Sequence, residues 1–311
     1  MMPGISAIEY VLPSGLLSLP ELADAGLLTS TPEQLKSFGF ESCYISGVPA
    51  EELALMAAAR LMESHQVVPE SIDLLLYAGA ISPSHQIGNG HFLSSFNYPA
   101  AMLQYELGLA RAAAIGVSQT GCMGLTYAVK FAVDFLQANP DAQRVLCVSA
   151  DVLPHGAARE ILFNVISDGA CALMVERHSQ QNCILAHRSV TKGYYWHCMD
   201  RKNEIMAAYF PTAKNLVEGL LQQAECDARE LRLLLPHNVS LRSWEILLDL
   251  IGLKHDQLFS RNIAQKGHVI AADNWINLKD AMDCGSLNRG DKFLLFNFGF
   301  GAHWAATLME Y

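Results

Sequence analysis

The sequence lacks several features that define whole classes of proteins. No uninterrupted apolar run reaches the roughly 18 to 20 residues that a membrane-spanning helix needs. The first ten residues contain no basic stretch followed by an apolar one, so we expect no secretory signal. The eight cysteines include no Cys-x-x-Cys pair and the histidines form no His-Glu-x-x-His motif, which argues against a disulfide framework and a metal site. We therefore expect a protein of the reducing cytoplasm.

Positive charge is also scarce. The 21 Lys and Arg residues are outnumbered by 31 Asp and Glu residues, which gives a formal net charge of −10. Binding to phosphates needs a basic surface, so the composition argues against a nucleic-acid partner, and we expect no membrane partner either. Hydrophobic residues make up 51% of the 311 residues and charged residues 17%, which excludes a disordered chain and provides for a sizeable core.

Helical and strand-like patterns alternate along the chain and indicate an α/β fold. In the first half the patterns predict helices at residues 49–65, 100–107 and 125–139, buried strands at 74–79, 144–150 and 171–175, and a further strand at 112–118. Residues 5–46 show only short apolar runs and turn residues.

The second half repeats this order, with predicted helices at 215–224 and 268–282 and strands at 232–237 and 293–297. Such a repeat predicts two duplicated halves, with two sheets stacked around shared central helices. We place the N-terminal half at residues 1–178 and the C-terminal half at residues 179–311.

Cys122 lies in Gly-Cys-Met-Gly, where a predicted strand turns into an apolar helix. A thiol at a helix N-terminus faces unpaired N–H groups and the positive end of the helix dipole, and both favour the nucleophilic thiolate. The neighbouring Gly121 and Gly124 let a substrate carbonyl approach the backbone. The alternative is a small buried apolar residue, which is what most free cysteines are.

Two histidines of the second half lie at comparable positions. His237 follows an apolar strand that ends at Pro236, at the sheet edge where α/β proteins place ligands. His268 follows Gly267 and precedes a helix, at the turn that matches the turn of Cys122 in the first half. A pseudo-twofold axis between the halves would bring His268 and His237 to Cys122. The alternatives are a buried His237 bonded to the backbone and a His268 that points into solvent.

The C-terminal Phe-Gly-Phe-Gly-Ala-His-Trp segment, residues 298–304, follows a predicted buried strand. Glycines at such a place let backbone N–H groups point into a cavity, as an oxyanion hole requires. The alternative is a tight turn that needs positive φ.

Five motifs occur in the order seen in thiolase-fold condensing enzymes: Gly-Cys-Met-Gly at 121–124, Ser-Asp-Gly-Ala at 167–170, Pro-His-Asn at 236–238, Gly-His at 267–268, and Phe-Gly-Phe-Gly-x-x-Trp at 298–304. From about Pro49 to Tyr311 the chain resembles ketoacyl-acyl-carrier-protein synthase III and its relatives in secondary metabolism. This resemblance implies a five-layer αβαβα thiolase-like fold, a homodimer, and a buried site fed by a pantetheine tunnel.

The resemblance also implies roles for particular residues. Cys122 matches the acyl-accepting cysteine and His237 the catalytic histidine. His268 falls where synthase III proteins usually have asparagine, and resembles the second histidine of the Cys-His-His set of elongating synthases. Arg242 matches an arginine near the carrier-binding mouth. Phe300 replaces the usual oxyanion-hole glycine, and its backbone N–H would act together with that of Cys122, while its side chain narrows the pocket.

Two departures from the family pattern point to a specialised enzyme. The early Trp and the Thr-Gly-Ile-x-x-Arg segment that help to hold coenzyme A have no clean match in residues 35–46, and residues 190–214 look short. These differences favour an acyl carrier protein, or a dedicated partner subunit, over coenzyme A as the acyl donor. Residues 82–99, rich in Gly, His, Asn and aromatics, are either a loop that reaches toward a partner's site or an ordinary surface loop.

Three functions remain open from the sequence. The leading hypothesis is a decarboxylative Claisen condensation, in which an acyl group on Cys122 is joined to a malonyl-type thioester. The second is transfer of that acyl group to a hydroxyl or amine, and the third is a non-catalytic subunit of a mixed synthase assembly. For the enzyme we expect acyl-coenzyme A or acyl-carrier-protein thioesters as substrates, no tightly bound cofactor, and a homodimer or a heterodimer with a related subunit.

Overall fold

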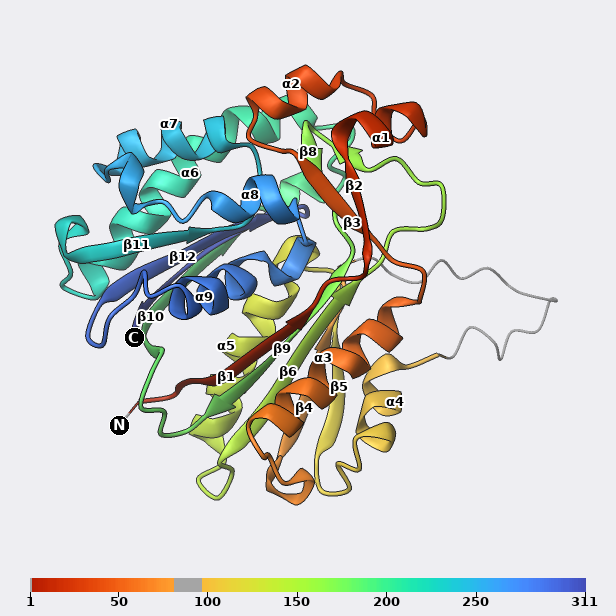
Figure 1. The fold of residues 1–311 in the computed structure, drawn as a ribbon. Coiled ribbons are helices and arrows are strands. Elements are labelled where there is room, and N and C mark those ends of the chain that lie inside the picture. The colour runs from red at the N-terminus through yellow and green to blue at the C-terminus, as the bar shows by residue number, and fades with distance from the viewer. Residues whose placement is uncertain (1, 81–96) are drawn as a thin grey trace.

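The computed structural model describes residues 2–80 and 97–311, so most of the 82–99 loop lies outside the described residues (Figure 1). Its main sheet has nine strands in the order β11-β12-β13-β10-β1-β9-β6-β4-β5. The strands are β1 (Gly4–Val11), β4 (Leu74–Ala78), β5 (Ala113–Val117), β6 (Arg144–Asp151), β9 (Gly169–Glu176), β10 (Cys183–Thr191), β11 (Leu231–Pro236), β12 (Lys292–Gly299) and β13 (His303–Glu310).

The strand pairings show the duplication directly. In the first half β4 and β6 are parallel, and the pairs β6–β9 and β9–β1 are antiparallel. In the second half β11 and β12 are parallel, and the pairs β12–β13 and β13–β10 are antiparallel. In the first half β4 also pairs with the parallel strand β5. At the corresponding place in the second half, beside β11, the described residues form only an isolated parallel bridge between Leu234 and Leu258. The two half-sheets join where β1 meets β10, through the residue pair Gly4 and Cys183.

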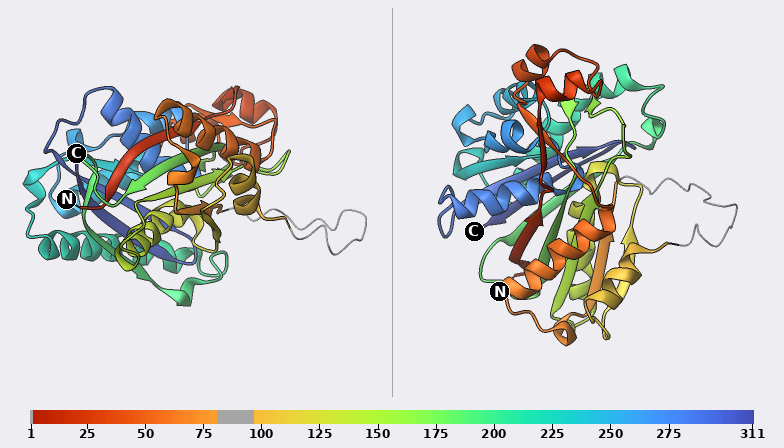
Figure 2. Two further views of the ribbon diagram at one scale, coloured as in Figure 1. Left: turned by 90° about the horizontal axis from the view of Figure 1, so that it is seen from below. Right: turned by 45° about the vertical axis from the view of Figure 1, so that its right-hand side comes forward.

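Five layers follow from how the helices cover these half-sheets. Helices α5 (Gly124–Ala138) and α9 (Asp273–Asp283) share one core with both half-sheets and form the central layer. Helices α3 (Ala50–Ser64) and α4 (Pro99–Glu106) cover the outer face of the first half-sheet. Helices α6 (Lys202–Gln223) and α7 (Leu241–Ile251) cover the outer face of the second. The predicted αβαβα fold is therefore confirmed (Figures 1 and 2).

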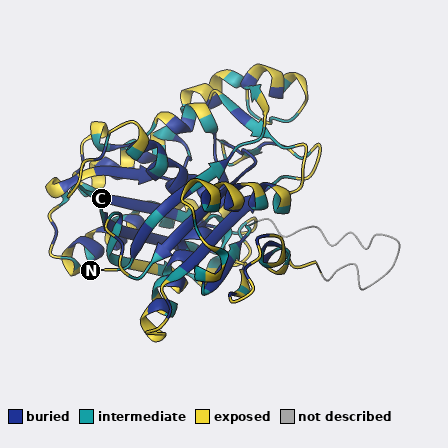
Figure 3. Cartoon of the chain, turned by 60° about the horizontal axis from the view of Figure 1, so that its bottom comes forward, coloured by how far each residue is buried: buried dark blue, intermediate teal, exposed yellow. Residues whose placement is uncertain are grey.

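Burial on both faces explains why the strands read as continuous apolar runs. In β6, Val145 and Cys147 enter the central core, while Leu146 and Val148 pack under the outer helices. Each fully buried Leu or Val side chain contributes about 1.5 to 3 kcal/mol relative to its exposed state. Figure 3 shows the result, with buried strands inside and exposed residues on the outer faces of the helices.

Two expectations for the secondary structure were wrong. Helix α6 begins at Lys202 rather than near residue 215 and includes Pro211. This proline cannot donate to the carbonyl of Ala207, but Ala207 is exposed, so water can take the place of that donor. Residues 5–46 contain more regular structure than expected: the central strand β1 and, beyond it, β2 (Gly15–Ser18), α1 (Leu19–Asp24), α2 (Pro32–Ser37) and β3 (Ser42–Ile45).

The N-terminal segment packs against the second half of the molecule. Leu22, Leu35 and Phe40 lie in the same apolar cluster as Trp244 of α7. The division after residue 178 falls between β9 and β10 and stays a prediction. Among the helices of the described residues, none combines the length and hydropathy needed to cross a membrane.

Candidate active site

Cys122 lies in a single 3₁₀ turn, Gly121–Met123, immediately before the central helix α5. The turn needs glycine at position 121, where φ is +53° and an added Cβ would lie 3.1 Å from the backbone nitrogen of Phe300. The backbone of the Cys122 turn is therefore in close contact with the end of β12. This places the thiol, which is partly buried, at the seam between the two halves.

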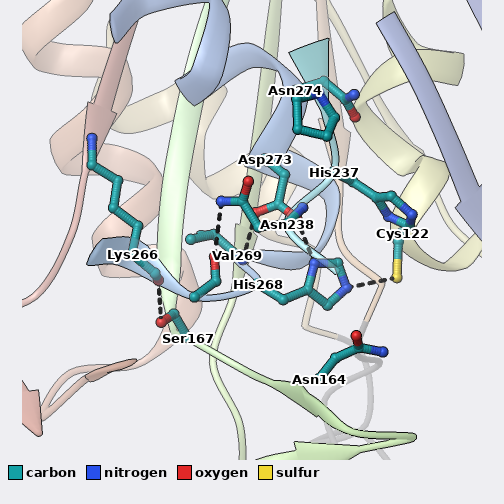
Figure 4. A network of polar contacts seen from close by, with 12 residues as sticks. Cys122, Asn164, Ser167, His237, Asn238, Lys266, His268, Val269, Asp273 and Asn274 are labelled. Atoms are coloured by element: carbon teal, nitrogen blue, oxygen red, sulfur yellow. Dashed lines mark hydrogen bonds and ion pairs between the residues drawn. The ribbon is translucent and has the colours of Figure 1, made fainter. Parts of the chain in front are cut away.

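Both histidines face this thiol from the second half (Figure 4). His237 follows the end of β11 at Pro236, and His268 follows helix α8 (Arg261–Lys266). The Nε2 atom of His268 lies 3.4 Å from the Sγ atom of Cys122. The two imidazole rings are 5.4 Å apart between centroids and nearly perpendicular. The structure thus brings together the three side chains that the sequence singled out.

A buried carboxylate that the sequence did not single out completes this group. Asp273, at the start of α9, accepts a hydrogen bond from Nδ1 of His268 at 2.5 Å. It also accepts from the backbone N–H groups of Val269 and Asn238, each at 2.6 Å. Three donors hold the carboxylate, which fixes the ring of His268 with Nε2 toward Cys122. Cys122, His268 and Asp273 therefore form a continuous chain of contacts.

The surroundings shift the pKa values of the two imidazoles in opposite directions. Burial lowers the pKa of His268, but the Asp273 carboxylate and the Cys122 sulfur outweigh burial and raise that pKa to about 10. Burial also lowers the pKa of His237, and the neighbouring His268 lowers it further, to well below 6.5. These shifts favour the charged form of His268 and the neutral form of His237 near neutral pH.

His237 has unused hydrogen-bonding capacity. Its ring is buried, and neither ring nitrogen has a partner among the described residues. Its backbone oxygen accepts from Nε1 of Trp244 at 3.0 Å, so the main chain is fixed while the ring stays unpaired. A buried polar group without a partner costs about 1 to 3 kcal/mol, and a substrate oxygen in the pocket would remove that cost.

Helix α9 also fixes the segments that carry the histidines. The side-chain amide of Asn277 donates to the carbonyl oxygen of Pro236 at 2.7 Å and to Oδ1 of Asn238 at 2.9 Å. The amide of Asn238 donates in turn to the carbonyl oxygen of Gly267 at 2.9 Å. One buried polar face of α9 therefore positions both imidazoles.

The Ser-Asp-Gly-Ala motif supports His268 from the first half. The backbone N–H of His268 donates to the carbonyl oxygen of Val165, and that of Ser167 donates to the carbonyl oxygen of His268. The hydroxyl of Ser167 donates to the carbonyl oxygen of Lys266 and accepts from the N–H of Tyr44. This motif therefore bridges the two halves at the site.

The end of β12 lies directly under the Cys122 turn. A Cβ added to Gly299 would lie 3.2 Å from the backbone nitrogen of Cys122 and 2.7 Å from the carbonyl oxygen of Thr120. The N–H groups of Cys122 and Phe300 therefore belong to two chain segments in contact. This arrangement suits a pair of backbone donors to one oxyanion.

We expect Gly299→Ala to disturb this contact. The added methyl would lie 2.7 Å from the carbonyl oxygen of Thr120 and 2.9 Å from the side chain of Met123, and the backbone contact forces the Cys122 turn to shift, at a cost of about 1 to 3 kcal/mol in stability. Urea unfolding should show the loss, and the rate of acyl labelling of Cys122 should fall about tenfold or more. Gly47→Ala is the matched control, because an added Cβ there meets nothing within 4 Å. Equal stability and labelling of both variants would contradict the close contact.

The thiol and both imidazoles line one pocket of about 560 Å³. Its walls are mainly apolar and include Phe298 of β12, Phe300 just after that strand, and Tyr209 and Phe210 from α6. The rings of Phe298 and Phe300 are 5.8 Å apart between centroids, so the side chain of Phe300 occupies part of the pocket wall. Such a lining suits an acyl chain.

Arg242 lies at the rim of this pocket, in the first turn of α7. Its side chain is 71% exposed and pairs with Glu245 at 3.2 Å. A cation at this place is available to an anionic group that enters the pocket.

His237, His268 and Asp273 each offer one ligand atom within 4.8 Å of the others, which is the spacing of a metal site. Both oxygens of Asp273 already accept hydrogen bonds, and Nδ1 of His268 is engaged with Asp273. A metal ion would have to replace these bonds. The hydrogen bonds therefore account for why these three side chains lie close together, and no metal ion is needed to explain it.

Comparison with known proteins agrees with the fold. Residues 118–193 match the family model 3-Oxoacyl-[acyl-carrier-protein (ACP)] synthase III, and residues 221–311 match the model of its C-terminal part. The beta-ketoacyl-[acyl-carrier-protein] synthase III of Desulfotalea psychrophila is 26% identical over 293 residues, covering 85% of this chain and 86% of the relative.

Solved structures show the same architecture. The crystal structure of 3-oxoacyl-[acyl-carrier-protein] synthase III from Aquifex aeolicus superposes with a TM-score of 0.86 at 23% identity, covering 99% of this chain and 100% of the other. The acyltransferase ChlB3 superposes with a TM-score of 0.87 at 20% identity, covering 100% and 98%. The fold and site define a thiolase-fold condensing enzyme. The two family models together cover more than half of the chain, which belongs to the 3-oxoacyl-[acyl-carrier-protein] synthase III family.

Proposed function

We propose that the protein loads an acyl group onto Cys122 and joins it to a malonyl-type thioester by decarboxylative Claisen condensation. The observation that carries this proposal is that two imidazoles from separate segments face one thiol in an apolar pocket. Relatives named beta-ketoacyl-[acyl-carrier-protein] synthase III support the same reaction class.

In the first step the Cys122 thiolate forms a bond to the carbonyl carbon of an acyl thioester. The backbone N–H groups of Cys122 and Phe300 hold the oxyanion. The bond to the carrier sulfur then breaks, and that sulfur takes the Nε2 proton of His268. Asp273 keeps the pKa of His268 raised, so the ring regains a proton from solvent before the second substrate reacts.

In the second step His237 and His268 donate hydrogen bonds to the thioester oxygen of the malonyl unit. The bond to the carboxylate breaks, carbon dioxide leaves, and the electron pair forms an enolate that these donors stabilise. The enolate carbon attacks the acyl group, the bond to Sγ breaks, and Cys122 returns as thiolate. The neutral His237 suits this role because its ring nitrogens have no partner among the described residues.

A second candidate is favoured by the Asp273–His268 pair. Directly after the first step, before it regains a proton from solvent, His268 is a neutral base that Asp273 holds in place through Nδ1. Condensation requires no proton to be removed from the second substrate, whereas a hydroxyl or amine acceptor does. Such an acceptor would give its proton to His268 while it attacks the acyl group, and the original ion pair would be restored.

Product analysis with a His237→Ala variant tests the proposal. We expect wild type to release carbon dioxide from a malonyl thioester in step with β-ketoacyl product. His237→Ala should load acyl groups normally but condense about a hundredfold more slowly, which is the effect of losing one placed donor. The control for histidine loss is His255→Ala, because His255 is exposed and does not line the pocket.

The outcomes separate the candidates. Turnover with hydroxyl or amine acceptors, without a malonyl donor and without carbon dioxide release, would select acyl transfer, and His237→Ala would then leave that turnover intact. No acyl labelling in any state, together with copurification of a second synthase-like chain, would select the non-catalytic subunit.

Roles for partners belong to the same proposal. We assign the acyl donor to acyl-carrier-protein or coenzyme A thioesters, with Arg242 at the carrier-binding rim and no tightly bound cofactor. Strand β5 is the edge of the sheet, and Ile115 on it is 50% exposed, which supports a homodimer, or a heterodimer with a related subunit, formed at this edge. A cytoplasmic enzyme of specialised metabolism fits these assignments.

A further inference from the structure

Three buried asparagine side chains form a chain of hydrogen bonds behind the two histidines, and we call them the amide chain. The Nδ2 group of Asn262 donates to Oδ1 of Asn277 at 2.7 Å, and Nδ2 of Asn277 donates to Oδ1 of Asn238 at 2.9 Å. Asn277 also donates to the carbonyl oxygen of Pro236, and Asn238 donates to that of Gly267. These two carbonyl groups belong to the residues directly before the two histidines of the site.

The amide chain works in one direction only. A side-chain amide has one end that accepts hydrogen bonds and one end that donates them, and rotation by half a turn exchanges the two ends. In the observed direction the last two amides present N–H groups to the carbonyl oxygens of Pro236 and Gly267. Reversed amides would present oxygen to oxygen at both places. The direction of the amide chain therefore decides whether the segments that carry the histidines are held.

An acidic side chain at the far end sets this direction. Asn262 donates through Nδ2 to Oδ2 of Asp280 at 2.7 Å, in addition to its bond to Asn277. A carboxylate only accepts, so Asn262 must present its NH₂ group there. The Oδ1 atom of Asn262 is left buried, without a partner among the described residues. Such an atom calls for an explanation, and the explanation here is that Asp280 imposes the orientation on Asn262.

Two further side chains fix the carboxylate of Asp280. The hydroxyl of Tyr10, on β1 of the first half, donates to Oδ1 of Asp280 at 2.9 Å. The ammonium group of Lys266 donates to Oδ2 of Asp280 and, at 2.6 Å, to the hydroxyl oxygen of Tyr10. None of the three lines the pocket, and Figure 4 shows the side chain of Lys266 pointing away from the imidazoles. Any effect of this group on the reaction must therefore pass through the amide chain.

We propose that Asp280, paired with Lys266, is a positioning residue, whose carboxylate sets the direction of the amide chain and so fixes both imidazoles for condensation. This inference rests on the proposed function, in which condensation needs both rings at one thioester oxygen, whereas loading of Cys122 needs one of them. A misplacement of about 1 Å in a reacting group lowers a rate about a hundredfold.

The two rings do not depend on the amide chain equally. His268 has its own bond to Asp273 through Nδ1, and this bond does not involve the amide chain. The ring nitrogens of His237 have no partner among the described residues, so its position depends on its backbone. Losing the carboxylate of Asp280 should therefore slow condensation much more than loading.

The double variant Lys266→Met/Asp280→Leu tests the inference. It removes both charges together, so no unpaired charge is left buried, and replacements of this kind often leave stability unchanged. We expect single-turnover conversion of acyl-Cys122 to β-ketoacyl product to slow about a hundredfold, and loading, followed by intact mass, to slow by less than about threefold. NMR should still show His268 titrating near pH 10, because the deleted pair has no net charge.

Asn262→Ala interrupts the amide chain without removing a charge, and it should lower condensation relative to loading to a similar extent. The matched control is Asn182→Ala. Asn182 is also buried, donates to the carbonyl oxygen of Ile5 at 3.2 Å and has an unpartnered Oδ1 among the described residues, but it does not line the pocket or belong to the amide chain. This control should lose stability in urea but keep the wild-type ratio of condensation to loading.

The outcomes separate the inference from the proposed function. A wild-type ratio of condensation to loading in the double variant or in Asn262→Ala would overturn the inference while the proposed function stands. A ratio that falls as far in Asn182→Ala would also overturn it, because general loosening would then explain the effect. If neither test variant folds, the network serves stability and the inference is wrong. Failure of wild type to load or to condense would refute the proposed function itself.

Discussion

Cys122→Ala will carry no acyl group after exposure to acyl thioesters that label the wild-type protein. In the proposed reaction the Cys122 thiolate forms the covalent bond, and its sulfur lies 3.4 Å from Nε2 of His268. Intact-mass spectrometry should show a single acyl adduct on wild type and a loss of labelling of at least about a thousandfold in the variant.

The control for this experiment is Cys284→Ala. Cys284 is the exposed cysteine of the described residues, so it is the most open to non-specific acylation. Labelling should survive its removal. If Cys122→Ala is labelled as well as wild type, while Cys284→Ala is not, then the assignment of the nucleophile is wrong.

Asp273→Asn will reduce turnover about a hundredfold to ten-thousandfold, which is the range expected when an active-site histidine loses its orienting carboxylate. The variant keeps the shape of the side chain but removes the charge that raises the pKa of His268. NMR of the ring should show His268 titrating near pH 10 in wild type and at much lower pH in the variant. The control is Asp283→Asn. Asp283 lies on the same helix, but it is exposed and pairs with Lys279 rather than with a histidine.

The same pair predicts how stability depends on pH. The folded-state pKa of His268, about 10, lies above the ordinary value of 6.5. Its contribution to stability is therefore fully present below pH 6.5 and is lost as pH rises toward 10. Urea unfolding between pH 6 and 10 should show this loss in wild type and a weaker one in Asp273→Asn. Identical slopes in the two proteins would contradict the assigned charge of His268.

Much of the fold could be predicted because its central strands are buried on both faces. Segments such as β6 and β11 then appear as apolar runs between turn residues, and the repeat of these runs indicates the duplication. Strand β1 could not be predicted from its pattern because a register shift between Ile5 and Ala7 breaks the alternation, and because Ser6 and Glu9 interrupt its apolar residues. Helix α6 was predicted too short because a proline normally marks a helix boundary.

The candidate site was predictable only in part. Cys122, His237 and His268 stand at turns that follow or precede apolar segments, and such turns are visible in a sequence. Asp273 is different, because an acidic residue in the first turn of a helix is common and needs no functional reason. A signal did exist: polar residues recur on α9 at positions 273, 277 and 280, on a helix that also contains Trp275 and Ile276. Only the structure shows that this polar stripe is buried, and that Asp273 and Asn277 hold the segments that carry the histidines.

The duplication has a consequence for how such a protein can arise. The sulfur belongs to one copy of the repeated unit, and the imidazoles and the carboxylate belong to the other. A single unduplicated unit could assemble this chemistry only by meeting a second chain, at a rate set by concentration. Fusing the copies makes that encounter intramolecular, so the effective concentration of the partner is set by the linker rather than by the cell. Each copy is then free to keep only its own share of the reactive groups.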